Sequence, residues 1–265
     1  MPAPDLGPPA PFQSIERPLA AHLLPGLVAA EQLSGSIVVV IDALRASVTI
    51  SAALASGASR VIPTLTVEAA IATRKRMIDS GHGAADIVLG GERGGVLIPG
   101  FDLDNSPLAY TPDSVRSRAV VFTTANGTAT MLHAASAARV LIGALTNLSQ
   151  VVRAIATDPR PVHILCSGTR GEITLDDCIA TGAIVDRLLL AGRQLVSDDS
   201  ALVCLLAWKQ AQSVGIEQMF SASRGGRNLL RLGFERDLSY CATVDALPVL
   251  PEYFPARGEL VLASS

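Results

Sequence analysis

The sequence predicts an α/β protein of three layers, α/β/α, in which a mixed, mainly parallel sheet lies between helices. Short apolar runs alternate with longer stretches of helical periodicity, which is the pattern of strand–helix–strand units. The first apolar run, residues 36–41, is continuous, as in a strand that is covered on both faces. Of the 265 residues, 49% are hydrophobic and only 4% are aromatic, which indicates a large aliphatic core.

Capping residues mark the helix ends in the first half of the chain. Gly57 follows one helical stretch as a C-terminal cap. Thr66 precedes the next as an N-terminal cap, and Glu68 complements the dipole of that helix. The predicted elements are strands at residues 36–41, 60–65 and 86–89, and helices at 46–56 and 66–79. A long glycine-rich loop, residues 89–107, follows the third strand.

The second half repeats the alternation and then becomes mixed. Strands are predicted at residues 118–122, 139–142 and 162–166, and helices at 127–137, 147–157, 175–191 and 200–213. A short helix near 228–232, a strand at 240–244 and a proline-rich end suggest some antiparallel pairing. Residues 1–14 are rich in proline and are predicted to be a disordered tail, which leaves one domain over residues 15–265.

Charge and hydropathy exclude several classes of protein. The net charge is −3, with 24 acids and 21 bases and no block of like charge, which argues against nucleic-acid binding. Apolar runs fall short of the roughly 20 residues that a membrane span needs, and no signal peptide is present, so we expect a cytoplasmic protein. The four cysteines form no Cys-x-x-Cys pair, so zinc is not expected and buried thiols are. A homodimer would be unsurprising.

Polar side chains gather where the predicted strands end, which is where ligands bind in open α/β sheets. They are Asp42 and Arg45 after the first strand; Glu92, Arg93, Asp102, Asn105 and Ser106 in the long loop; Asn126, Gly127 and Thr128 after residue 122; and Arg170, Asp176 and Asp177 after residue 166. Carboxylates suit Mg²⁺, and guanidinium groups suit tetrahedral oxyanions. The sequence therefore predicts a small, multiply anionic substrate that is held with a metal ion, and a long loop that folds over it.

Structural roles are open for each of these residues. Asp42 could simply cap the helix that follows it, and Asp176 and Asp177 could serve the dipole of theirs. Each arginine alone could be a surface or ion-pair residue. Other signatures fail: Gly94 and Gly95 are not followed by the Lys of a P-loop, and no dinucleotide fingerprint follows the first strand.

Five blocks resemble the 2-phosphosulfolactate phosphatase family, the ComB-like proteins. They read "VVVIDALRAS", "LGGERGGVLIPGFDLDNSP", "TTANGT", "GTRGEITLDDCIATGAIV" and "LLRLGFERDLSYCATVDALPVLP", in the family's order, over residues 36–254. The resemblance implies an α/β/α fold and the Mg²⁺-dependent hydrolysis of 2-phospho-3-sulfolactate to 3-sulfolactate and phosphate, a step of coenzyme M biosynthesis in methanogens. Asp104, Ala43 and Ala125 depart from the family's pattern.

Roles follow from the matched blocks together with the chemistry of the residues. The metal ligands are expected among Asp42, Glu92, Asp176 and Asp177. The catalytic residues are expected to be Asp42, Arg45, Glu92, Arg93 and Asp177, and the substrate-binding residues Asp102, Asn105, Ser106, Asn126, Gly127, Thr128 and Arg170. Arg45, Arg93 and Arg170 would spread the charge of the transferring phosphoryl group. Either water, which we favour, or an aspartate attacks phosphorus.

Three other functions stay open at this point. The protein could hydrolyse another small phosphorylated acid. It could be a non-catalytic module that binds organic phosphates or sulfonates, which would use the arginines but not the metal carboxylates. It could also be a structural or interaction protein in which these charges are solvated loop residues.

Overall fold

The computed structural model describes residues 16–196 and 199–263, so the predicted tail at 1–14 lies outside the described residues. Within these two ranges, eleven strands form one sheet in the order β5-β4-β6-β3-β11-β10-β7-β2-β8-β1-β9. The strands are β1 (Pro18–His22), β2 (Ile37–Ile41), β3 (Arg60–Pro63), β4 (Ile87–Arg93), β5 (Val96–Leu97), β6 (Ala119–Thr123), β7 (Arg139–Gly143), β8 (Val162–Cys166), β9 (Gln194–Leu195), β10 (Pro251–Phe254) and β11 (Glu259–Leu262). Most pairings are parallel, and with its helices this sheet confirms the predicted α/β class.

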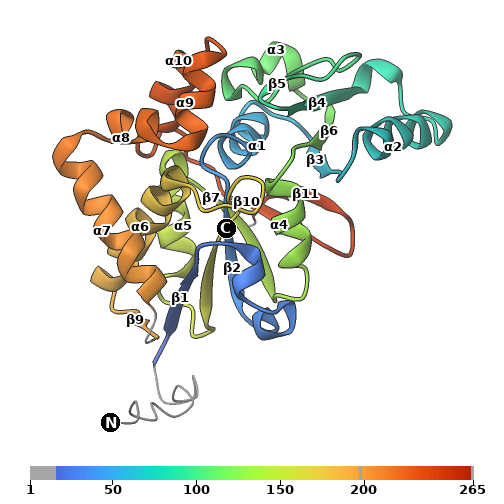
Figure 1. The fold of residues 1–265 in the computed structure, drawn as a ribbon. Helices are drawn as coiled ribbons and strands as arrows, with labels where there is room; N and C mark the ends of the chain where they lie inside the picture. Colours follow the sequence, from blue (N-terminus) through green and yellow to red (C-terminus); the bar gives the residue numbers. More distant parts are fainter. Residues whose placement is uncertain (1–15, 197–198, 264–265) are drawn as a thin grey trace, which may run out of the picture.

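The sheet consists of two parallel groups that an antiparallel hairpin joins. β4, β6 and β3 form one group, and β7, β2, β8, β1 and β9 form the other. β10 and β11 pair antiparallel with each other and with their outer neighbours β7 and β3, so the two groups run in opposite senses along the ladder. Figure 1 shows the groups in different parts of the molecule, with β1 and β2 below and β4 and β6 at the upper right.

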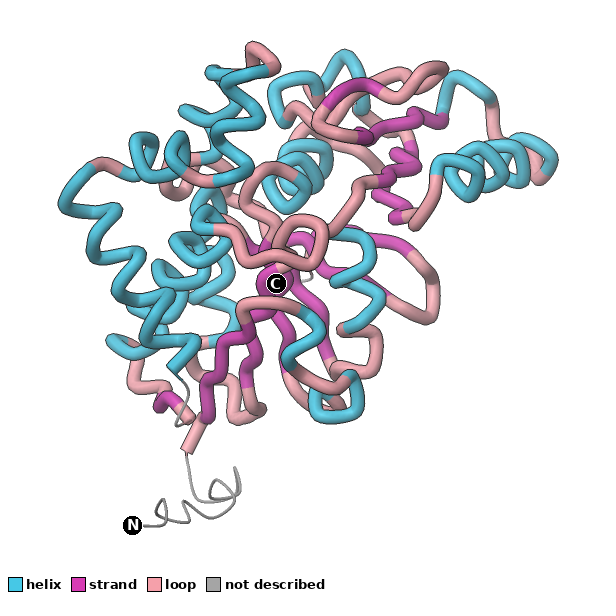
Figure 2. Tube along the Cα trace, in the orientation of Figure 1, coloured by secondary structure: helices cyan, strands magenta, loops and turns pink. Residues whose placement is uncertain are grey.

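Ten α-helices surround the described part of this sheet. They are α1 (Ala46–Ala55), α2 (Val67–Asp79), α3 (Pro112–Val115), α4 (Gly127–His133), α5 (Leu148–Ile155), α6 (Leu175–Leu190), α7 (Asp199–Val214), α8 (Ile216–Ala222), α9 (Arg224–Arg231) and α10 (Glu235–Cys241). α6 packs against β2, β8 and α7, whereas α2 packs against β4 and β6. Figure 2 shows helices gathered on the left of the molecule, and loops mixed with short strands at the upper right.

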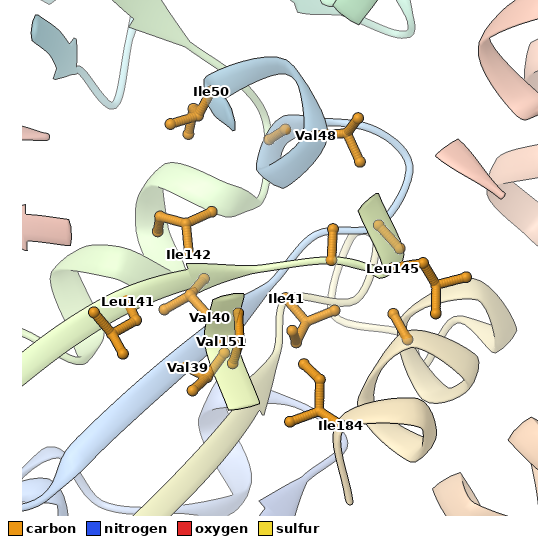
Figure 3. Close-up of a cluster of buried hydrophobic side chains, with 14 of the residues drawn as sticks. Val39, Val40, Ile41, Val48, Ile50, Leu141, Ile142, Leu145, Val151 and Ile184 are labelled. Carbon is orange, nitrogen blue, oxygen red and sulfur yellow. The ribbon is translucent and has the colours of Figure 1, made fainter. Parts of the chain in front are cut away.

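β2 lies at the centre of the hydrophobic core. Its residues are fully buried, as the continuous apolar run predicts. Figure 3 shows Val39 and Ile41 of this strand among Leu141 of β7, Val151 of α5 and Ile184 of α6. The core is aliphatic because β-branched and leucine side chains from parallel strands meet helices on the sheet. This packing fixes the end of β2, from which Asp42 emerges.

Most predicted elements are present, with shifted ends. Thr66 caps α2 as expected, because its Oγ1 accepts from the N–H of Ala69 at 3.1 Å. The strand after residue 86 extends to Arg93, and the helix at 127–137 ends at His133. The expected antiparallel pairing at the end is confirmed by β10 and β11.

The predicted strand at 240–244 is wrong. Tyr240 and Cys241 end the helix α10, in which Asp237, Leu238 and Cys241 are buried together. That spacing of one and four residues is helical, and it outweighs the local preference of Tyr, Cys and Val for strands. β1 was not predicted, since its sequence PLAAH lacks β-branched residues.

Two further expectations concern membranes and thiols. No helix in the described ranges is both long and apolar enough to cross a membrane. Cys166, Cys178, Cys204 and Cys241 are all free and buried, as predicted.

Candidate active site

A cavity of about 560 Å³ lies where the loops after four strands meet α9. The loops follow β2, β4, β6 and β8, two strands from each parallel group. The charged and amide side chains that line it are Asp42, Arg45, Glu92, Asn105, Asn126, Arg170, Arg224, Arg227, Asn228 and Arg231. Six of the residues predicted from the sequence are among them, namely Asp42, Arg45, Glu92, Asn105, Asn126 and Arg170. The loop at residues 89–107 therefore contributes to the cavity as expected.

Asp42 both caps α1 and faces the cavity. Its Oδ1 accepts from the N–H of Ala46 at 3.1 Å, so the capping role that the sequence allowed is real. Its Oδ2 lies beside Gly127, where an added Cβ would be only 2.9 Å from that oxygen. Gly127 is thus the residue that lets the start of α4 approach the carboxylate. Burial raises the pKa of Asp42 well above its ordinary value, and the neighbouring charges of Asp177, Asp176 and Glu92 raise it further.

Asp177 joins the loops after β2 and β8. Its Oδ1 accepts from the N–H of Ala43 and its Oδ2 from that of Gly168, both at 2.8 Å. Burial raises the pKa of Asp177 to about 6 even though these amide bonds favour the charged form. Both oxygens are therefore occupied by main-chain donors, and the carboxylate holds the two loops together.

Asp176 is the neighbour with a free oxygen. Its side chain is buried, and its Oδ1 has no hydrogen-bond partner among the described residues. Burial raises the pKa of Asp176 to about 7, and the charge of Asp177 adds to that rise. An unpartnered buried carboxylate oxygen costs free energy unless a proton or a cation satisfies it.

Glu92 shapes the cavity through the main chain. Its Oε2 accepts from the N–H of Gly95 at 2.7 Å, and its Oε1 from that of Ala125 at 3.1 Å. The carboxylate thereby ties the turn after β4 to the turn after β6. Since both oxygens accept main-chain hydrogen bonds, the main role of Glu92 is to hold these two turns together, and it is a weaker candidate for a metal ligand.

Arg45 is buried in an ion pair with Asp237 of α10. It also donates to the carbonyl oxygen of Gly95 at 3.1 Å and lies 4.5 Å above the ring of Phe234. The other oxygen of Asp237 accepts from Ser106 Oγ at 2.7 Å. Ser106 is thus bound to this pair and does not line the cavity.

Seven predicted site residues do not line the cavity: Ser106, Asp176 and Asp177, described above, and Arg93, Asp102, Gly127 and Thr128. Arg93 donates to Thr123 Oγ1 at 2.9 Å and to the carbonyl of Leu65 at 3.3 Å, and it does not line the cavity. Asp102 lies in a separate hollow, 3.6 Å from Arg74. Gly127 and Thr128 start α4 behind the cavity wall, where Thr128 is fully buried. Their predicted roles at the site remain predictions from the sequence.

Two amides occupy the wall as predicted. Asn126 accepts from the N–H of Arg170 at 3.1 Å, which joins the turns after β6 and β8. Asn105 is buried, and its Oδ1 has no partner in the described part of the chain. A buried amide oxygen at a cavity wall is an acceptor that a ligand or water can satisfy.

α9 supplies three arginines that our sequence prediction missed. Arg224, Arg227 and Arg231 stand three and four residues apart, so they share one face of the helix. This spacing can be read directly from the stretch "SRGGRNLLR", residues 223–231. What the sequence lacks is any sign that this face turns toward loops more than one hundred residues away.

The acids only partly fit the expected magnesium site. In the ranges that the structure describes, no group of three or more His, Cys, Asp and Glu side chains is arranged to hold a metal ion. Asp177 and Glu92 use their oxygens on main-chain amides, which leaves Asp42 Oδ2 and Asp176 Oδ1. Mg²⁺ needs only one or two carboxylates when a phosphate and waters complete its shell. The residues present fit such an ion better than a four-acid cage.

The fold and the cavity define an α/β protein that gathers carboxylates and guanidinium groups for a multiply charged anion. Comparison with family models agrees and is more specific. Residues 22–255 match the model described as 2-phosphosulpholactate phosphatase, and the chain belongs to that family.

Curated relatives match nearly the whole chain. A protein of Symbiobacterium thermophilum is 40% identical over 233 residues, which are 88% of this chain and 97% of the relative. A protein of Deinococcus radiodurans is 38% identical over 83% of this chain and 88% of its own length. A protein of Carboxydothermus hydrogenoformans is 35% identical over 86% of this chain and 90% of its own length. Each is named a probable 2-phosphosulfolactate phosphatase.

Proposed function

We propose that this chain is a Mg²⁺-dependent phosphatase that hydrolyses 2-phospho-3-sulfolactate to 3-sulfolactate and phosphate. One observation carries the proposal: a single cavity is lined by two buried acids, Asp42 and Glu92, and by five arginines, in a chain that matches the family over residues 22–255. The substrate bears a phosphate, a sulfonate and a carboxylate, so it needs several cations at once.

The residues divide the work of binding. Asp42 Oδ2 and Asp176 Oδ1 would hold the magnesium ion, which supplies positive charge to a phosphate oxygen when it is bound. Arg170 is exposed and lines the cavity, so its guanidinium group would be available to bind a phosphate oxygen. Asp177 and Glu92 keep the loops in register and so hold Asp42 in place. Positioning of this kind and electrostatic stabilisation account for most of the catalysis of phosphoryl transfer.

Burial raises the pKa of Asp176 to about 7 in the metal-free chain, so binding of the magnesium ion near neutral pH would displace a proton from this carboxyl. The choice between water and an aspartate as nucleophile stays as predicted from the sequence, with water favoured.

The test is release of phosphate from 2-phospho-3-sulfolactate with Mg²⁺ and with EDTA. Phospholactate and phosphoglycolate serve as comparison substrates, since both lack the sulfonate. We expect Mg²⁺-dependent release that is fastest with the sulfonated substrate. Asp42→Asn should lower kcat/KM by about 10²–10³-fold, whereas Asp113→Asn, an exposed acid on α3, should stay within about twofold of wild type.

Failure would take one of two forms. If no phosphorylated acid is hydrolysed but sulfolactate or phosphate binds, the chain is a binding module for organic phosphates or sulfonates. If an unsulfonated ester is the better substrate, the protein is a phosphatase, but 2-phospho-3-sulfolactate is not its substrate. The cytoplasmic location, the place in coenzyme M biosynthesis and the homodimer remain predictions from the sequence.

A further inference from the structure

α9 forms one wall of the cavity and presents a row of guanidinium groups to it. Arg224, Arg227 and Arg231 all line the cavity. Arg224 forms an ion pair with Glu172, in the loop after β8, so its charge is balanced within the chain. The other two differ from it in this respect.

Arg227 and Arg231 each donate to a neutral oxygen atom. Arg227 donates to the carbonyl oxygen of Ala222, and Arg231 donates to Asn228 Oδ1 at 2.7 Å. Over the described ranges no carboxylate forms a salt bridge with either. A guanidinium group has five donors, and these neutral contacts leave most of them unused. Two such groups side by side on a concave wall are suited to an external oxyanion.

The row starts beside Asp176 and runs away from it. An added Cβ at Gly225 would lie 3.5 Å from Asp176 Oδ1, so the first turn of α9 lies against that carboxylate. An added Cβ at Gly95 would lie 2.9 Å from Asn228 Nδ2, so the helix then passes the turn after β4. Arg227 and Arg231 are two and six residues beyond Gly225, a rise of roughly 3 and 9 Å along the helix. They therefore offer positive charge further along the cavity wall than Asp176.

We propose that Arg227 and Arg231 form a second anion subsite, which binds the sulfonate of the substrate while the acid end of the cavity takes the phosphate. The identity of the ligand rests on the proposed function; the subsite itself does not require turnover. The sulfonate stands one bond further from the ester carbon than the carboxylate does, so it is the acid group that reaches furthest along the row. The row thus makes the protein selective for phosphate esters that carry a second, distant acid group.

Calorimetric titration of the whole chain with 3-sulfolactate, lactate and inorganic phosphate tests this subsite without turnover. The double variant R227Q/R231Q should bind sulfolactate about tenfold or more weakly, and phosphate and lactate within about twofold of wild type. R236Q is the matched control, since Arg236 is an exposed arginine on α10 outside the cavity lining; it should bind all three as wild type does. R231Q alone should lose about threefold for sulfolactate and keeps the test open if the double variant does not fold.

Several outcomes would overturn the subsite. These are unchanged affinity of R227Q/R231Q for sulfolactate, an equal loss for phosphate or lactate, the same loss in R236Q, or no binding of sulfolactate to the wild type. The phosphate-release assay separates this inference from the proposed function. If the expected binding pattern is found without hydrolysis, the subsite stands and the proposed phosphatase activity does not. If hydrolysis is found without that binding pattern, the phosphatase activity stands and the subsite does not.

Discussion

Two buried clusters of charge lie close to the same cavity, and they differ in balance. Arg45 and Asp237 form a pair, and Ser106 donates to the same carboxylate. Asp42, Asp176 and Asp177 form a group in which the neighbouring charges that shift the pKa of Asp42 are all acidic. The first cluster is complete without a ligand. The second is complete only with protons or a cation.

The difference shows which buried charges serve the fold and which serve the ligand. The ion pair of Arg45 and Asp237 holds α10 to the loop after β2. Removal of either charge leaves the other buried without a counter-charge. An unpaired acidic group instead lowers stability, and proteins retain such groups where function needs them. Substitution in the two clusters should therefore change stability in opposite directions.

The largest effect is expected at the balanced pair. Asp237→Asn leaves the buried Arg45 guanidinium without a counter-charge, so the free energy of unfolding should fall by about 3–5 kcal/mol. Ser106→Ala, which removes one neutral donor to the same carboxylate, should cost about 1 kcal/mol. Urea unfolding of both variants measures this. A loss below about 1 kcal/mol for Asp237→Asn would mean that the pair does not hold the fold.

Asp176→Asn is expected to raise the free energy of unfolding, whereas Asp237→Asn lowers it. Burial raises the pKa of Asp176 to about 7, so the folded chain keeps a proton that the unfolded chain releases near its ordinary value of 3.8. Stability from this group is therefore present at low pH and is lost as pH rises toward about 7. An asparagine avoids this loss and should stabilise the metal-free protein by about 2 kcal/mol at pH 8, and by less at pH 5. Urea unfolding of Asp176→Asn and of the wild type at pH 8 and at pH 5 measures this. A variant less stable than the wild type, or a gain in stability that is equal at the two pH values, would contradict a raised pKa at Asp176.

Magnesium should relieve the same imbalance. At pH 8, a concentration near ten times Kd should stabilise the folded protein by about 1.4 kcal/mol and raise Tm by about 2–4 °C. Asp42→Asn should lose this shift, because Asp42 Oδ2 is one of the two oxygens free to bind the ion. NaCl at equal ionic strength is the control. An equal rise with NaCl, or a full rise in the variant, would argue against a metal at Asp42.

The smallest effect is expected at Asp102, an acid of the same long loop outside the cavity. Its carboxylate is nearly half exposed and lies 3.6 Å from Arg74. Its Oδ2 accepts from the N–H of Leu89 at 2.8 Å, a bond that an asparagine oxygen can keep. Asp102→Asn should therefore change stability by less than about 0.5 kcal/mol. A change as large as that at Asp176 would remove the distinction between buried and exposed acids on which the comparison depends.

The sequence alone determined the elements whose signal is local. The apolar run of β2, the Thr66 cap of α2 and the alternation of strands and helices depend on neighbours within a few residues. The rule that ligands meet the carboxyl ends of strands also selected Asp42, Glu92, Asn126 and Arg170 for the cavity. Asp42, Asn126 and Arg170 follow their strands directly or by a few residues, and Glu92 lies at the end of β4, so the place of each is fixed once its strand is fixed.

Only the tertiary structure decided how those strand ends are arranged. The hairpin of β10 and β11 reverses one parallel group against the other, and no local pattern encodes which strands it joins. The same long loop sends Glu92 into the cavity and Asp102 to a separate hollow, although both are acids. α9 brings Arg227 and Arg231 to loops that lie more than one hundred residues earlier. Local periodicity states which face of an element is polar, whereas what that face meets depends on contacts between distant segments, which form only when the whole core packs.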